Sequence, residues 1–208
     1  MSKIIAGIVI FVVAAPAQYV VPFASRDNLI ELTVENASAF RQEHITVEAV
    51  DVPSCVSFTS ARYAVKGLGE LEKRAAIFRF SVDKSAPVGR EHVLALKVST
   101  PAGQSWTKEI RFSVAAPEKF ELFQNYPNPF NPTTVVSYQL SVVSHVNLRV
   151  FDLLGREVAT LIDEKQTAGY HQETWDASRF SSGMYMYELV ASSDQGKTVL
   201  RKTMLLVK

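Results

Sequence analysis

The hydrophobic and polar positions of this chain alternate in short runs, and long helical periodicity is absent. Apolar residues at every second position place one face of an extended strand in a core and the other in water. In the segment 76–82, for example, Ala, Phe, Phe and Val fall on one side, and Ile, Arg and Ser on the other. The first half is therefore predicted to hold strands at 29–34, 45–50, 76–82, 92–99 and 106–114.

The same pattern continues in the second half, where turn residues separate the runs. Asp152 and Gly155, and Asp194 and Gly196, stand between neighbouring runs and favour tight hairpins, since Gly and Asp tolerate positive φ. Many short strands between turn signals are typical of antiparallel sandwiches. We predict strands at 135–140, 146–151, 157–162, 170–175, 184–190 and 198–207.

One segment has the composition of a helix. Residues 68–77 read LGELEKRAAI, which is rich in helix formers. Gly67 and Gly69 at its start and a strand pattern after it favour a loop that leads into a strand.

The first residues have the order of a secretory signal peptide. Lys3 is followed by an apolar run from Ile4 to Ala15 and by the sequence Ala-Pro-Ala, so cleavage is expected before Gln18. The alternative is a membrane anchor, because the stretch from Ile4 to Phe23 has no charge and about 20 residues span a bilayer. Prolines and a glutamine within that stretch favour cleavage and export through the periplasm.

Residues 115–119 (AAPEK) have few bulky apolar groups and a proline, as expected of a linker. The chain is long enough for two small domains. We predict a tandem of two Ig-like β-sandwiches: a signal peptide at 1–17, a leader at 18–27, a first sandwich at 28–114, a linker at 115–119 and a second sandwich at 120–208.

Charge and cysteine content exclude several functions. The 22 basic and 21 acidic side chains nearly balance, and no basic run alternates with aromatics, so nucleic-acid and anionic membrane partners are not indicated. Cys55 is the only cysteine, which excludes an intrachain disulfide and a cysteine-rich zinc site. Its apolar surroundings predict a small buried side chain.

Catalytic motifs are absent from the sequence. There is no G-x-S-x-G elbow, no P-loop and no H-E-x-x-H, and the four histidines lie far apart in or beside strand patterns. Asp152 and Asp176 follow strands and are predicted to accept turn N–H bonds. We therefore expect no enzyme activity, no catalytic or metal-binding residue and no cofactor.

The second half carries a motif set in a fixed order. NYPNPFNPTT begins at Asn125, VFDLLGREV follows, then Trp-Asp, Ser-Gly-Met-Tyr and a terminal LLVK. This set closely resembles the type A C-terminal sorting domain of type IX secretion substrates. The motif residues are Asn125, Tyr126, Pro127, Asn128, Pro129, Phe130, Asn131, Pro132, Asp152, Gly155, Trp175, Gly183, Tyr185 and Lys208.

The resemblance implies an Ig-like sandwich that an outer-membrane translocon recognises and a sortase-type protease often removes. The protein would then be secreted or displayed on the cell surface. Separately, we expect a monomer. Residues 28–114 resemble, more weakly, Ig-like accessory modules of the NEW3 kind, through the segments LTVEN, VPS and APVG.

The same motif residues also have an interpretation from physical chemistry alone. Prolines at 127, 129 and 132 are expected to hold an extended lead-in, with Phe123, Tyr126 and Phe130 pinning it to the sandwich. Gly155 and Gly183 are expected at a hairpin and at the start of a strand, and Trp175 and Tyr185 in the core.

Lys208 has no such core explanation, because terminal residues usually fray. Recognition of the terminus is therefore expected from the family resemblance.

The function expected is that of an exported protein, with the second sandwich as its sorting signal and the first as a non-catalytic structural or interaction module. An alternative is a glycan- or protein-binding accessory module that uses Trp106 and Tyr63. A further alternative is the C-terminal fragment of a larger secreted hydrolase.

Overall fold

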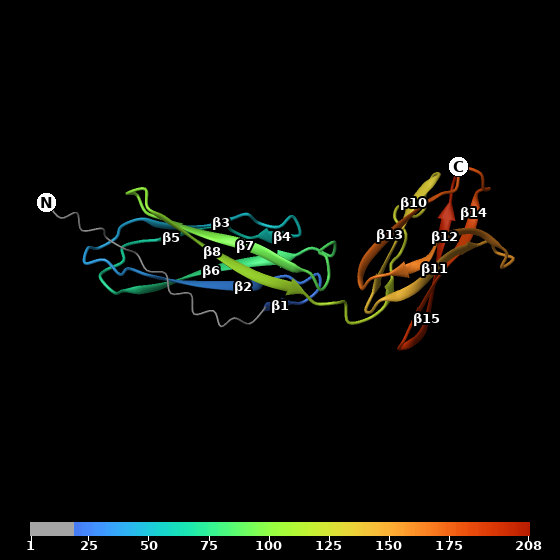
Figure 1. Ribbon diagram of the computed structural model, residues 1–208. Helices are drawn as coiled ribbons and strands as arrows, with labels where there is room; N and C mark the ends of the chain where they lie inside the picture. The colour runs from blue at the N-terminus through green and yellow to red at the C-terminus, as the bar shows by residue number, and fades with distance from the viewer. Residues whose placement is uncertain (1–18) are drawn as a thin grey trace. The chain divides into compact units, whose positions relative to one another are not determined.

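The computed structural model describes residues 19–208, all of whose regular secondary structure is β (Figure 1). The predicted signal peptide at 1–17 lies outside the described residues. Four sheets, two in each half, confirm the prediction of an all-β protein built of Ig-like sandwiches. The chain divides into two compact units between Ala115 and Ala116, and each unit is described by itself.

The first unit packs two sheets around one core. In β6, Ala76, Phe78, Phe80 and Val82 are buried while residues between them face water, which is the predicted alternation. Cys55 is buried in the same core, as expected. The five-stranded sheet has the order β1 (Tyr19–Val21), β8 (Ser105–Val114), β7 (Glu91–Ser99), β3 (Ile45–Val50) and β5 (Arg62–Val65); the three-stranded sheet has β2 (Asn28–Glu35), β6 (Lys73–Val82) and β4 (Val56–Phe58).

The first sandwich begins earlier than the sequence predicts. Strand β1 lies in the segment 18–27 assigned to a leader, yet it pairs in parallel with the end of β8, with Tyr19 opposite Phe112 and Val21 opposite Val114. A strand of three residues is too short to show alternation.

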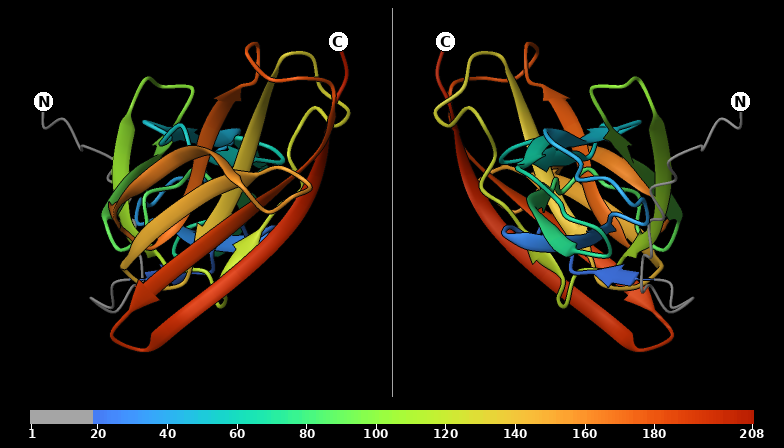
Figure 2. Two further views of the ribbon diagram at one scale, coloured as in Figure 1. Left: turned by 90° about the vertical axis from the view of Figure 1, so that its right-hand side faces the viewer. Right: turned by 90° about the vertical axis from the view of Figure 1, so that its left-hand side faces the viewer.

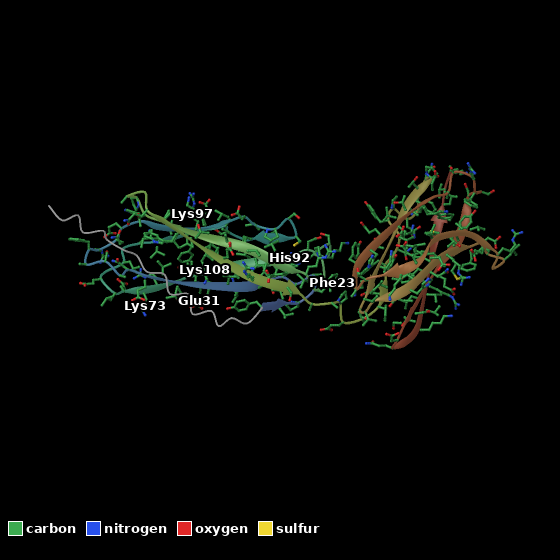
Figure 3. All side chains as sticks on the ribbon, viewed as in Figure 1. Phe23, Glu31, Lys73, His92, Lys97 and Lys108 are labelled. Atoms are coloured by element: carbon green, nitrogen blue, oxygen red, sulfur yellow. The ribbon has the colours of Figure 1, made fainter. Side chains whose placement is uncertain are left out.

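Charged side chains such as Glu31, Lys73 and Lys97 lie along the surface of this unit (Figure 3).

The second unit also has two sheets around a core of its own. Leu148, Tyr138 and Tyr187 are among its largest fully buried side chains. Its four-stranded sheet has the order β12 (Glu157–Gln166), β11 (Ser144–Phe151), β14 (Gly183–Ser193) and β15 (Gly196–Leu206); its three-stranded sheet has β13 (Gly169–Asp176), β10 (Thr133–Leu140) and β9 (Glu121–Leu122).

Every predicted strand overlaps an observed one, and the charged segment 68–77 is a turn followed by β6 rather than a helix. The strands that the sequence missed, β1, β4, β5 and β9, have at most four residues each. Such short runs carry almost no periodicity.

Candidate functional site

Residues 124–130, named the strap here, are fixed by the buried side chain of Asn125. Its amide donates to the carbonyl of Pro127 at 3.0 Å and to Thr134 Oγ1 at 2.9 Å, and its backbone N–H donates to the Tyr187 hydroxyl at 3.0 Å. The peptide bonds before Pro127 and Pro129 are cis. The hydrogen bonds of Asn125 tie the strap to the core, and bends at residues 127–129 show that it is not the extended lead-in expected from its prolines.

The strap lies along the last strand of the unit. Leu205 donates its N–H to Asn128 Oδ1 and accepts the N–H of Phe130, both at 3.0 Å. Val207 donates to the carbonyl of Phe130 at 3.0 Å, and Phe130 forms a parallel bridge with Leu206. Figure 2 shows this yellow loop beside the red C-terminal strand.

Trp175 holds the strap from the inside. Its ring lies 5.6 Å from that of Phe130, 5.5 Å from that of Phe180 and 5.3 Å from that of Tyr185. The Tyr185 hydroxyl donates to the carbonyl of Ser181 at 2.8 Å, so a buried polar tip is satisfied. The predicted core role of Trp175 and Tyr185 is confirmed.

Tyr126 behaves differently from the other aromatic residues of the motif. Phe130 is only 2% exposed, as predicted for an anchor, but Tyr126 is 81% exposed. Its predicted anchoring role is wrong, because Asn125 and Phe130 already hold the strap on either side of it.

The C-terminal residue is tied down rather than frayed. Lys208 donates its backbone N–H to Ser182 Oγ at 3.0 Å and its Nζ to the carbonyl of Ser178 at 2.7 Å. Gly183 begins β14 beside these contacts with a φ of 154°, which a side chain would strain. The loop 178–183 thus holds Lys208 in one position.

The hairpin between β11 and β12 completes the motif set. Asp152 Oδ1 accepts the N–H groups of Leu154 and Arg156, and Gly155 has a φ of 77°, as predicted for this turn. Desolvation acts to raise the pKa of Asp152, but hydrogen bonds from Arg156 and Leu154 outweigh it and leave the pKa below its ordinary value.

Strand pairing brings these motifs to one end of the sandwich. Strands β11, β13 and β15 end there, and β10 and β14 begin there. Asp176, at the end of β13, has a pKa lowered by the hydrogen bonds from Ser178 and, more weakly, by the charges of Arg179 and Lys208. We name this end the motif end; the exposed apolar side chains on it are Tyr126, Leu153, Leu154, Met184, Leu205 and Val207.

Sequence reasoning missed Met184, Leu205 and Val207 as exposed members of the motif end. In the terminal run, Met204 and Leu206 are buried, whereas Leu205 and Val207 are 38% and 47% exposed. Alternation along the last strand could have identified them. However, the last strand ends in a run of consecutive apolar residues, and such a run does not show which face of the strand is buried.

In the first unit, the cysteine thiol lies close to a histidine ring. Cys55 Sγ lies 4.0 Å from His92 Nδ1, and His92 Nε2 lies 3.0 Å from the carbonyl of Pro87. Burial raises the pKa of the Cys55 thiol, so it stays protonated and is a poor nucleophile. In residues 19–208, no three His, Cys, Asp or Glu side chains gather as a metal site would require.

These arrangements can be set beside known families. Residues 124–205 match the model of the secretion system C-terminal sorting domain. The match includes the whole strap, the hairpin and nearly all of the last strand. The chain therefore carries a type IX sorting signal, which indicates a secreted or cell-surface protein that interacts with the secretion machinery.

Several solved structures are similar to the chain at low identity. Dimeric latent PorU from Porphyromonas gingivalis is 15% identical, with 97% of this chain covered and a TM-score of 0.37; this chain spans only 20% of that protein. A protein of unknown function from Porphyromonas gingivalis W83 is 13% identical, with 92% and 96% of the two chains covered and a TM-score of 0.34. The CupB2 chaperone of Pseudomonas aeruginosa is 17% identical, with 91% and 97% covered and a TM-score of 0.31. At such TM-scores these similarities say nothing of function.

No curated protein matches the chain. Between residues 19 and 208, no helix has the length and apolar character needed to cross a membrane.

Proposed function

We propose that the second unit is the translocation and sorting signal of an exported protein, and that its motif end is the surface the translocon recognises. The observation that carries this proposal is the order of the segment 205–208. Leu205 and Val207 are bonded to the strap, and Lys208 is bonded to the loop 178–183. A surface that is already ordered loses less entropy on binding.

We also propose that residues 28–114 form a non-catalytic structural or interaction module and that the protein is a monomer. The protonated Cys55 thiol and the solvated charged faces of this unit support that assignment. The aromatic candidates for a glycan or protein site do not stand out from the surface. Tyr63 packs against Phe78 at 6.4 Å, and Trp106 is half-buried.

The sorting role is tested by expressing the intact chain and a version ending at Ala116 in a type IX-competent bacterium. Cells are then fractionated, and intact masses are taken from surface and medium. We expect the intact chain outside, without residues 1–17, and the shortened chain in the periplasm. Equal export of both versions would refute the sorting role.

The motif end is tested separately from the fold of the unit. Val207→Asp places a charge on the motif end, and Val143→Asp places one on a side chain of similar exposure at the opposite end of the unit. We expect the first substitution to trap the protein in the periplasm and the second to leave export unchanged. The two purified variants should have the same unfolding midpoint. Equal export of the two variants would show that the translocon does not recognise the motif end.

A further inference from the structure

The last strand, β15, keeps part of its outer edge open. The backbone of Leu205 faces away from β14, since it bonds to Asn128 and Phe130 of the strap. Alternate residues of an antiparallel strand share this direction. The N–H and C=O groups of Val199 and Arg201 therefore also point outward.

The strap does not reach these residues. Its contact nearest the start of β15 is the bond from Gln124 Nε2 to the carbonyl of Thr203, at 2.7 Å. Beyond it, no group in residues 19–208 bonds to the outward backbone of Val199 or Arg201. Unpaired edges of this kind are templates for a further strand.

The two edges of the four-stranded sheet differ in regularity. At the β12 edge the pairing with β11 shifts register twice, which leaves Leu161 and Val158 without partners. Such bulges bend an edge and discourage pairing. Strand β15 pairs with β14 without any shift from Gly196 to Leu206, so its open half is straight enough to accept a strand.

The side chains beside the open edge are basic. Lys197, Val199 and Arg201 share the outer face, with the Val199 side chain 42% exposed, and Lys202 lies on the other side of the strand. Arg201 is already paired with Glu188, whereas Lys197 and Lys202 have no ion-pair partner among the residues that the structure describes. Lys197 is therefore the unpaired cation on the outer face, and it favours an acidic strand because opposite charges on facing strands attract.

We propose that the open half of β15, from Lys197 to Arg201, binds an extended acidic segment of a partner protein by strand addition. Backbone hydrogen bonds to Val199 and Arg201 would supply the affinity, and a carboxylate opposite Lys197 the selectivity. The site is separate from the motif end, so the proposal stands or falls independently of the sorting role.

The probe is the capped peptide acetyl-Thr-Glu-Thr-Val-Thr-Glu-Thr-amide, which presents Glu, Val and Glu on one face. Amide resonances of the chain from residue 18 onward are followed by NMR during titration. We expect shifts and exchange protection confined to residues 197–203. The same peptide with Lys in place of Glu should bind about fivefold more weakly, since the favourable pair with Lys197 becomes repulsive.

Variants of the chain locate the site. Lys197→Glu should weaken binding about fivefold, while Lys165→Glu on β12 makes the same charge change and should leave binding unaltered. Val199→Pro removes an outward donor without removing a bond to β14, and should abolish binding. The Lys197 and Lys165 pair keeps the test decisive if the proline variant does not fold.

Three results would overturn the proposal. They are an absence of shifts at 197–203, equal binding of the two peptides, and concentration-dependent protection of β15 without peptide. The last result would mean that a second copy occupies the edge.

Discussion

The two units close their larger sheets with the same device but with different sequences. In each, a segment from the start of the unit pairs in parallel with the end of the last strand: Val21 with Val114 in the first, and Phe130 with Leu206 in the second. The first unit uses three apolar residues, whereas the second uses a strap shaped by asparagine and proline. The two units share this topology, but only the closing segment of the second has a recognisable sequence motif. Its backbone conformation requires particular residues, whereas that of the first does not.

The units also differ in how they treat charge. In the first unit, Arg62 and Glu48 meet at 3.2 Å with both side chains well exposed. In the second, Glu188 is 7% exposed on the outer face of its sheet and bonds to Arg149 Nη2 at 3.0 Å and to Arg201 Nε at 2.6 Å. The first unit also has a buried carboxylate, Glu35, but it pairs with a single exposed lysine, Lys73, at 3.2 Å. The second unit differs in placing its buried carboxylate between two arginines.

The largest effect is expected at the indole that supports the strap. Trp175→Ala should lower the free energy of unfolding of the second unit by about 3–5 kcal/mol and leave the first unit unchanged. Denaturant unfolding followed by NMR peaks from each unit measures both. Coupled loss of the two units would show that they do not unfold independently.

The buried carboxylate comes next. Glu188→Gln keeps the volume but removes the charge between Arg149 and Arg201, which should lower stability by about 2–3 kcal/mol. The value is below that of a fully buried pair because Arg201 is largely exposed. Unfolding midpoints in urea provide the measurement, and a change under about 0.5 kcal/mol would mean that water solvates the carboxylate.

Alkaline pH should distinguish the units further. Burial raises the pKa of Tyr187 to about 12 in the folded second unit, from an ordinary value of 10.0. The unfolded chain then releases a proton that the folded chain keeps, so stability is full below pH 10 and falls as the pH rises toward 12. Unfolding across that range should show the fall in the second unit, with a smaller slope in Tyr187→Phe; an unchanged slope would assign the effect to another group.

The smallest effect is expected in the first unit. Glu48→Gln breaks an exposed ion pair with Arg62 and should change the free energy of unfolding by less than about 0.5 kcal/mol. At high salt this change should be smaller still, because salt screens exposed charges. A thermal melt at low and high ionic strength is sufficient. A change as large as that of Glu188→Gln would erase the contrast between the units.

The sequence predicted the all-β fold and the long strands because alternation and turn residues are local signals. It also predicted the turn carboxylate of Asp152, the positive φ of Gly155 and the burial of Trp175. It did not predict that the strap lies on β15, because pairing between Asn128 and Leu205 joins residues far apart in the chain. The exposure of Tyr126 was missed for the same reason.

The strap has a consequence for the order of folding. Its bonds join Gln124 to Thr203 and Asn128 to Leu205, so the contacts that close the second unit link its beginning to its end. Contacts of such long sequence separation form late and slowly. The strap can therefore close only when the end of β15 is in place, because its partners Leu205 and Val207 lie there.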